Sequence, residues 1–126
     1  MINITTGAAL VGISGAALYG ASKAALTLLT KAWAAEFGPS GVNINAIAPG
    51  PTTTPGTTTQ GVGGNTRNLP ARRIAQATEM VGAAVYLASD EANYVYGVTL
   101  PVDGGGSATL PIDGEARTRQ PAMTRR

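Results

Sequence analysis

The order of secondary-structure elements along the chain constrains its fold more than any other feature of the sequence. Residues 2–6, 42–47 and 97–102 have the β-branched or alternating character of short strands. Between them lie helical patterns over residues 17–37 and 77–88. Strands that alternate with helices at this spacing indicate βαβ units, in which the strands run parallel and the helices cover the sheet. We therefore predict an α/β fold with a parallel sheet of about three strands and flanking helices.

The helical pattern over residues 17–37 is apolar on nearly every side. It is rich in Ala and Leu, which favour a helix, and it stops at a Gly-Pro pair. Its only charged residues are Lys23, Lys31 and Glu36. A helix of this kind is normally buried on more than one side. One side can pack on the predicted sheet, so the other needs a second helix layer or another subunit. We expect a homo-oligomer that forms through this helix.

The composition limits the chemistry that the chain can perform. The 126 residues are enough for one domain and include neither cysteine nor histidine. Disulfides and thiolate metal sites are therefore excluded. The lack of histidine also removes the commonest general base and the commonest metal ligand. Any acid–base chemistry must use tyrosine, lysine, carboxylates or hydroxyls.

The positive charge of the chain is confined to its end. Cations and anions balance over residues 1–105, and the net charge of +2 comes from residues 106–126. We expect residues 1–105 to form the domain and residues 106–126 to form a basic, disordered tail. The arginines of this tail are not interleaved with aromatic residues, so we expect no nucleic-acid partner.

Neither a membrane span nor a signal peptide is evident in the sequence. The apolar stretch over residues 24–35 is interrupted by Lys31 and is too short to cross a bilayer. The N-terminus has no basic region before an apolar run. We expect no membrane association and, by default, a cytoplasmic location.

Tyr19 and Lys23 form a pair with clear chemical potential. They are four residues apart, so on a helix they share a face, one turn apart. A free phenol has a pKa near ~10, which is too high for efficient proton exchange at neutral pH. A neighbouring ammonium stabilises the phenolate form and lowers the pKa of a phenol. The pair is therefore a sensible proton donor and acceptor in a chain without histidine, although the Tyr-x-x-x-Lys spacing alone is weak evidence.

Several segments match, in order, the motifs of one enzyme family. Residues 19–26 resemble its active-site helix, and residues 3–6 resemble the strand end that carries its catalytic hydroxyl, 13 residues before the tyrosine. Residues 45–50 resemble its strand and Pro-Gly turn beside the nicotinamide, and residues 96–105 resemble its last strand and Gly-rich exit. The family is the short-chain dehydrogenases/reductases. The resemblance spans residues 2–105 and implies a partial Rossmann-like domain.

The resemblance implies an NAD(P)-dependent oxidoreductase that transfers a hydride between nicotinamide and a carbonyl or alcohol substrate. Tyr19 would be the acid in carbonyl reduction and the base in alcohol oxidation. Lys23 would assist Tyr19 and hydrogen-bond the nicotinamide ribose, and Tyr19 would also be among the residues that bind the cofactor. Thr6 stands where the family usually has a serine that polarises the substrate carbonyl, and it keeps the hydroxyl but adds a methyl group. Ser14 is an alternative hydroxyl at a different spacing, and we favour Thr6.

The resemblance also implies where the cofactor would lie. Pro49 and Gly50 would form the turn against the nicotinamide, while Thr52, through its backbone, and Thr54, through its hydroxyl, would hold the carboxamide. The alternative is that this turn only ends a strand. Residues 55–70 would form a loop that covers the substrate.

The strands that follow the first strand of the family and the Asn-bearing helix segment of its catalytic set are absent from the 126 residues, and one sequence motif is absent with them. This is the Gly-x-x-x-Gly-x-Gly fingerprint, which binds the cofactor phosphates after the first strand. The chain also opens within a predicted strand. We therefore expect the catalytic half of such an enzyme without its nucleotide-binding half, and no detectable affinity of the isolated chain for NAD(P)H.

The sequence leaves open the kind of protein, the choice of cofactor and the substrate. The chain could instead be a non-catalytic binding or interaction subunit that pairs with a complete one, or the product of an incomplete gene. The choice between NAD and NADP is not readable, because the residues that decide it belong to the missing half. The substrate could be a 3-oxoacyl thioester, a sugar, a steroid or a small alcohol.

Overall fold

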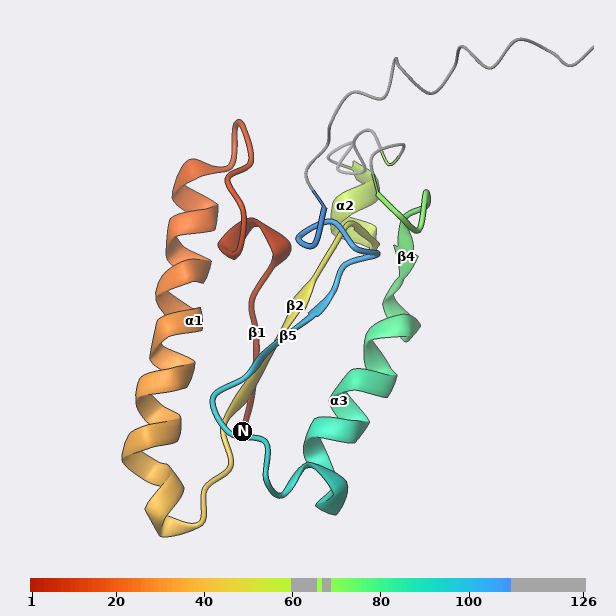
Figure 1. Ribbon diagram of the computed structural model, residues 1–126. Helices are drawn as coiled ribbons and strands as arrows, with labels where there is room; N and C mark the ends of the chain where they lie inside the picture. The colour runs from red at the N-terminus through yellow and green to blue at the C-terminus, as the bar shows by residue number, and fades with distance from the viewer. Residues whose placement is uncertain (60–65, 67–68, 110–126) are drawn as a thin grey trace, which may run out of the picture.

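The computed structural model describes residues 1–59, 66 and 69–109 (Figure 1). Within these residues a parallel sheet has the strand order β1 (Ile2–Ile4), β2 (Asn45–Pro49) and β5 (Thr99–Val102). Helix α1 (Ala17–Phe37) flanks one side of this sheet, and helix α3 (Val81–Ala88) flanks the other. The predicted α/β fold with about three parallel strands and flanking helices is confirmed.

Strand β2 is the buried centre of the sheet. Ala46, Ile47 and Ala48 are completely buried, and Ile44, just before the strand, is 1% exposed. A strand that is covered on both faces carries apolar residues at consecutive positions, whereas one-sided burial produces alternation. The sequence predicted the strand over residues 42–47 from alternation. The strand begins three residues later, at Asn45, and its consecutive buried residues reflect the helices on both of its faces.

A buried amide in β2 organises the loop that leads into β5. The Nδ2 atom of Asn45 donates to the Val95 carbonyl at 2.7 Å, and its Oδ1 atom accepts from the Val98 amide at 3.0 Å. Buried polar groups are normally satisfied in this way. Gly97, within the loop, has a φ of 68°, and a β-carbon there would lie 3.4 Å from the Ala34 β-carbon on α1. The loop is therefore fixed against both β2 and α1.

Helix α1 has the predicted bounds and approaches its neighbours closely. A β-carbon on Gly20 would lie only 2.8 Å from the carbonyl oxygen of Ala8, so a larger residue would push the helix away from this loop. On another face, the side chains of Leu18 and Leu28 are 89% and 68% exposed. One side of α1 packs as expected, while apolar side chains on the other face solvent in the single chain. None of the helices in the described ranges has the length and apolarity needed to cross a membrane.

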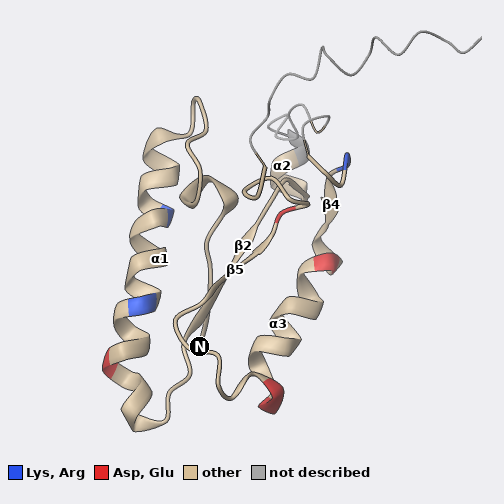
Figure 2. Ribbon diagram, viewed as in Figure 1, with Lys and Arg blue, Asp and Glu red and all other residues tan. Residues whose placement is uncertain are grey.

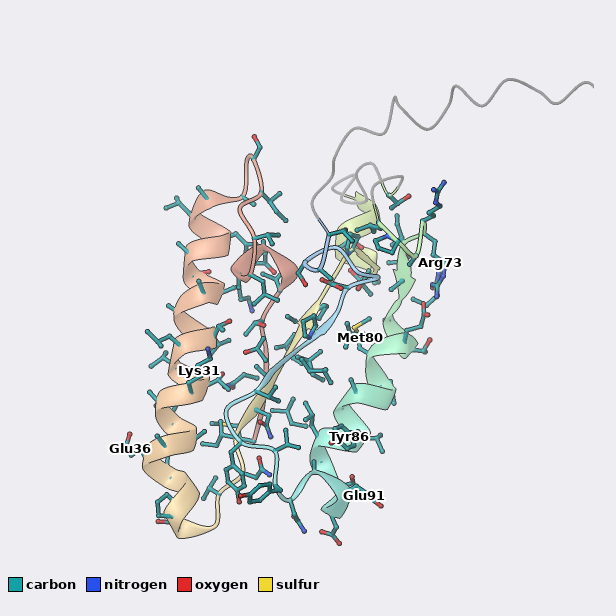
Figure 3. All side chains as sticks on the ribbon, viewed as in Figure 1. Lys31, Glu36, Arg73, Met80, Tyr86 and Glu91 are labelled. Carbon is teal, nitrogen blue, oxygen red and sulfur yellow. The ribbon has the colours of Figure 1, made fainter. Side chains whose placement is uncertain are left out.

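The predicted helix over residues 77–88 has two parts. Residues Ala77–Met80 form a 3-10 helix, and α3 continues it. A capping box, in which Gln76 and Glu79 satisfy each other's backbone amides, begins the segment. The residues predicted to face the core are all at least partly buried: Met80, Ala83, Ala84 and Leu87. Figure 3 shows Met80 between this helical segment and the sheet.

A second, two-stranded sheet forms from residues in which the sequence predicted no strand. Strand β3 (Thr52–Thr53) pairs in parallel with β4 (Ala75–Gln76), and α2 (Pro55–Thr59) follows β3. These short elements have no apolar period of their own, so their pairing depends on tertiary contacts. The chain that leaves β2 is thereby held beside the main sheet.

Two predicted segments lie partly or largely outside the described residues. These are the covering loop, of which residues 60–65 and 67–68 are not described, and the basic tail, of which residues 110–126 are not described. Charged side chains are sparse on the rest of the chain, and α1 carries only a few (Figure 2).

Candidate functional site

A cleft of about 500 Å³ opens at the carboxyl ends of β1 and β2. In α/β folds, ligands bind outside the carboxyl ends of parallel strands. The cleft is lined by side chains from β1, α1, the turn after β2, and the segment that carries β3 and α2. It brings together every residue that the sequence assigned to the site: Thr6, Tyr19, Lys23, Pro49, Gly50, Thr52 and Thr54.

Helix α1 contributes a phenol and an ammonium to the cleft. Tyr19 lies in its first turn and is 53% exposed. Lys23, one turn later, is half-buried, and its Nζ donates to the carbonyl oxygen of Ile4 at 2.9 Å. This hydrogen bond directs the ammonium from the helix towards the end of β1. The two side chains therefore line the same cleft, as their spacing predicts.

Two threonines follow β1, and they differ in their surroundings. The hydroxyl of Thr5 is buried and donates to the Ile47 carbonyl at 3.1 Å, which ties the end of β1 to β2. Thr6 is the N-cap of a 3-10 helix, Gly7–Ala9, and its Oγ1 accepts from the Ala8 amide at 3.4 Å. Both residues line the cleft, whereas Ser14 is exposed and is not part of its lining.

The turn after β2 requires a glycine. The Gly50 amide donates to the Val102 carbonyl at 3.0 Å. A β-carbon on Gly50 would lie 2.5 Å from the α-carbon of Asp103 and 2.8 Å from its carbonyl oxygen. Real β-carbons do not approach backbone atoms so closely, so only glycine fits here without a shift of the backbone. The turn at Pro49 and Gly50 is therefore fixed from behind by the end of β5.

The threonines that follow this turn form a compact hydrogen-bonded group. The Thr52 hydroxyl donates to the Gly50 carbonyl at 2.9 Å, and the Thr57 hydroxyl donates to the Thr52 carbonyl at 2.9 Å. The Thr54 amide donates to the Thr57 hydroxyl at 2.7 Å. Thr57 also lines the cleft, although sequence reasoning did not single it out. The Thr57 amide in turn donates to the Thr54 hydroxyl at 3.2 Å, which caps the start of α2.

Three further cleft residues were not singled out from the sequence: Ile13, and Thr66 and Leu69, which lie within the segment 55–70 that was predicted to cover the substrate. Ile13 lies in the connection before α1, and the other two lie in the Thr- and Gly-rich segment after α2. Nothing in the local sequence distinguishes these residues from their neighbours, because tertiary packing alone brings them to the cleft.

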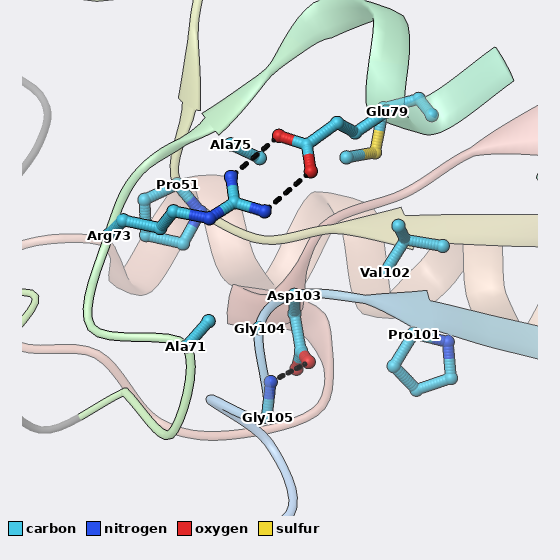
Figure 4. A pocket seen from close by; sticks show the side chains of 11 residues that line it. Pro51, Ala71, Arg73, Ala75, Glu79, Pro101, Val102, Asp103, Gly104 and Gly105 are labelled. Atoms are coloured by element: carbon cyan, nitrogen blue, oxygen red, sulfur yellow. Dashed lines mark hydrogen bonds and ion pairs between the residues drawn. The ribbon is translucent and has the colours of Figure 1, made fainter.

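A second hollow of about 270 Å³ lies on the other side of Pro51 (Figure 4). Arg73 and Glu79 pair across it, with the two Nη atoms 2.7 and 2.6 Å from the carboxylate oxygens. The hydrogen bonds from Arg73 and then from the Gln76 amide lower the pKa of Glu79 to about 2. This ion pair closes the turn that carries β4, so it supports the strand pairing beside the cleft.

Asp103 closes the turn after β5. Its two carboxylate oxygens accept from the amides of Gly105 at 2.9 Å and Ser107 at 2.8 Å. Partial burial opposes ionisation, but hydrogen bonds from Ser107 and the backbone outweigh it, and the pKa of Asp103 is lowered. Asp103 thus acts as a turn residue. In the described part of the chain, no cluster of three or more Asp, Glu, His or Cys side chains could hold a metal ion.

The cleft therefore presents a phenol, an ammonium and several hydroxyls, with no imidazole available anywhere in the sequence. Such a set can exchange one proton with a bound oxygen and can hydrogen-bond a polar ligand, but it offers no strong nucleophile. This chemistry suits proton transfer that accompanies another reaction step.

Comparison with protein families returns one that covers most of the chain. The family described as Enoyl-(Acyl carrier protein) reductase matches residues 1–107. Among curated proteins, the trans-4-hydroxycyclohexanecarboxylate dehydrogenase of Sinomonas cyclohexanicum is 36% identical over 108 residues. The match covers 86% of this chain and 41% of that protein. The chain thus spans about two-fifths of the length of this curated relative.

Solved structures agree with the sequence comparison. A short chain dehydrogenase/reductase family protein is 52% identical, superposes with a TM-score of 0.81, and is matched over 86% of this chain and 45% of its own. A 4-hydroxyisoleucine dehydrogenase complexed with NADH is 31% identical and superposes with a TM-score of 0.76. The match covers 86% of this chain and 46% of that dehydrogenase chain. The matching part of both structures has the fold described above.

Proposed function

This chain belongs to the short-chain dehydrogenase/reductase family, and on that premise we propose that it carries the catalytic part of an NAD(P)-dependent oxidoreductase. The reaction is hydride transfer between nicotinamide and a carbonyl or secondary alcohol. One observation supports the proposal most strongly. Seven residues from separate segments, all assigned from sequence, line one cleft at the carboxyl ends of the strands.

The proposed roles follow from the chemistry of each side chain. In the reducing direction, the Tyr19 hydroxyl donates a proton to the substrate oxygen, and in the oxidising direction its phenolate accepts that proton. The Lys23 ammonium stabilises the phenolate electrostatically. The Thr6 hydroxyl donates a hydrogen bond to the substrate oxygen and polarises the carbonyl. When bound, NAD(P)H supplies the hydride.

The residues present fit the nicotinamide end of that cofactor. A cleft of about 500 Å³ has room for a nicotinamide ring and a compact substrate. Pro49 and Gly50 line the cleft, and the close contact of Gly50 with Asp103 fixes the position of their turn for a bound ring. We propose that Pro49 and Gly50 contact the ring, that Thr52 and Thr54 hold the carboxamide, and that Lys23 binds the ribose hydroxyls.

The phosphate-binding fingerprint of the family is not among the 126 residues. The proposal therefore assigns to this chain the nicotinamide and substrate side of the site, with either NAD or NADP as cofactor. We expect calorimetry to detect no NAD(P)H binding by the isolated chain, because the adenosine and phosphate contacts dominate dinucleotide recognition. Micromolar affinity would show that this chain binds the whole cofactor unaided.

A fusion enzyme tests the catalytic proposal directly. Residues 1–107 replace the matching segment of the solved relative that is 52% identical to this chain. Reduction of a panel of ketones is followed through NADH and NADPH oxidation. The proposal predicts turnover that depends on Tyr19. A folded fusion that binds NAD(P)H but reduces none of the ketones that the parent relative reduces would contradict it.

A second candidate function is a non-catalytic subunit that pairs with a complete relative. Thr6, which stands where the family usually has a serine, favours it. NAD(P)H oxidation is measured for the chain alone, for a complete homologue alone, and for the mixture. A mixture whose rate depends on Tyr19 of this chain supports the catalytic function, whereas a mixture whose rate does not change when Tyr19 is replaced by Phe supports the subunit function.

We also propose that α1 forms an interface between copies of the chain. Leu18, Leu28 and Leu29 are exposed on it, and burying such side chains on association is favourable. Sedimentation should show a homo-oligomer in the micromolar range. Replacing Leu28 with Gln should shift the equilibrium towards monomer, and a parent chain that is monomeric throughout would contradict the proposal.

A further inference from the structure

Three consecutive glycines after β5 face three consecutive residues of the segment that returns from α2. A β-carbon on Gly104 would lie 2.9 Å from the β-carbon of Ala71. One on Gly105 would lie 2.6 Å from Cγ of Pro70, and one on Gly106 would lie 2.9 Å from Cδ2 of Leu69. The two segments therefore pack in register and in opposite directions. Figure 4 shows Ala71 beside Gly104 and Gly105.

Backbone hydrogen bonds hold the returning segment on this glycine turn. The Ala71 amide donates to the Gly104 carbonyl at 3.1 Å. The Leu69 amide donates to the Thr66 carbonyl at 3.0 Å, and the Leu69 carbonyl accepts from the Arg72 amide at 2.9 Å. The backbone of Leu69 is thus fixed on both sides, so its side-chain position depends on what lies against it.

The side chain of Leu69 stands between the glycine turn and the cleft. Leu69 lines the cleft, whereas Gly106 does not. Cδ2 of Leu69 packs where a side chain at position 106 would begin. An atom added at position 106 must therefore displace the Leu69 side chain, and the cleft is the space that this side chain lines.

We propose that Leu69 limits the bulk of the substrate that the cleft accepts, and that the absence of a side chain at Gly106 sets this limit. The proposal rests on the proposed oxidoreductase function, because it concerns the substrate side of that same cleft. Leu69 touches substrate in this account, whereas Gly106 acts only through Leu69. If the Leu69 side chain extended further into the cleft, it would exclude bulky ketones first and small ketones last.

Gly106→Ala is a suitable probe of this contact. Gly106 does not have the left-handed backbone that Gly104 and Gly105 adopt, with φ of 64° and 86°, so alanine needs no backbone strain there. The nearest atom to the new β-carbon is the far end of the flexible Leu69 side chain. Gly12→Ala is the matched control, since a β-carbon on Gly12 would meet nothing within 4 Å.

The experiment uses the full 126-residue chain with labelled leucine methyls and tyrosine rings, observed by NMR. Cyclohexanone and the bulkier 2-decalone are titrated into the parent chain, Gly106→Ala, Leu69→Ala, the double variant and the Gly12→Ala control. We expect Gly106→Ala to shift the Leu69 methyl signals. It should weaken the binding of 2-decalone by about 10-fold and change the affinity for cyclohexanone by less than about 2-fold.

The double variant provides the decisive comparison. Once Leu69 is alanine, nothing remains for the new methyl at position 106 to displace, so the double variant should bind 2-decalone like Leu69→Ala alone. Additive effects, or equal weakening of both ketones, would overturn the role of Leu69 while leaving the proposed function intact. If neither ketone shifts the Tyr19 or Leu69 signals of the parent chain, the proposal that Leu69 limits substrate bulk is overturned, while the proposed function is decided separately by turnover in the fusion enzyme.

Discussion

The backbone of Gly50 lies so close to that of Asp103 that a β-carbon at position 50 would be 2.5 Å from the Asp103 α-carbon. The contact joins the turn after β2 to the exit from β5. Asp103 in turn holds the amides of Gly105 and Ser107. One glycine thereby connects the proposed nicotinamide contact to the turn on which Leu69 rests.

Replacing Gly50 with Ala should destabilise the protein, because backbone atoms must move to admit the new β-carbon. Overpacking of this kind typically costs about 1–3 kcal/mol. Urea unfolding measures the loss. Gly12→Ala is the control and should unfold like the parent chain. Equal stability of the two variants would show that the contact between Gly50 and Asp103 yields easily.

The Thr6 hydroxyl should matter for turnover in the fusion enzyme. Thr6→Ser keeps the hydroxyl and should retain activity, whereas Thr6→Val removes the hydroxyl at similar volume and should lower kcat by about 10-fold or more. Ser14→Ala should leave kcat unchanged, since Ser14 does not line the cleft. The reverse pattern, with Ser14→Ala the slow variant, would transfer the polarising role to Ser14.

Lys23→Met should reduce both turnover and cofactor affinity in the fusion enzyme. The change removes the ammonium that bonds to the Ile4 carbonyl and faces the cleft, while it keeps the length of the side chain. Lys31→Met on the same helix is the control, because Lys31 is exposed and is not part of the cleft. Steady-state kinetics with varied NAD(P)H should separate the two variants, and similar kinetics would argue against a role for Lys23.

The ion pair between Arg73 and Glu79 should make the folding stability of the chain depend on pH. The pKa of Glu79 is lowered from its ordinary value of 4.5 to about 2 in the folded chain, chiefly by the hydrogen bond from Arg73. The stabilisation is therefore complete above pH 4.5 and is lost as the pH falls towards 2. Because the pair is exposed, the effect is small and weakens in high salt.

Urea unfolding between these pH values tests this dependence. The difference in stability between the parent chain and Glu79→Gln should shrink as the pH falls. Glu36→Gln, which makes the same change of charge at an exposed position on α1, supplies the control. A difference between parent and Glu79→Gln that is constant with pH would contradict the assignment.

Much of the fold was predictable because its signals are local. The bounds of α1 follow from a run of helix formers that ends at Gly38 and Pro39. The core face of the helix over residues 77–88 follows from its period. The bounds of β2 were wrong by about three residues, because a strand buried on both faces loses the alternation that marks a strand.

The candidate site was predictable to the extent that its residues carry chemistry. A phenol and an ammonium one turn apart, a hydroxyl at a strand end, and a Pro-Gly turn are all visible in the sequence. Thr57 and Leu69 lie in the segment 55–70 that was predicted to cover the substrate, but neither was singled out, because tertiary packing brings them to the cleft. The pairing of β3 with β4 was missed for the same reason, since strands of two residues are too short to show an alternation of apolar and polar residues.

The most direct measurement compares kcat for ketone reduction between the fusion enzyme and its Tyr19→Phe variant. The account predicts that kcat for ketone reduction falls by about 10²–10⁴-fold, because the proton donor to the substrate oxygen is lost. The unfolding transition should change little, since Tyr19 is half-exposed. Tyr94→Phe, at a fully exposed tyrosine, should behave like the parent. Turnover in Tyr19→Phe close to that of Tyr94→Phe would contradict the claim that this phenol transfers the proton.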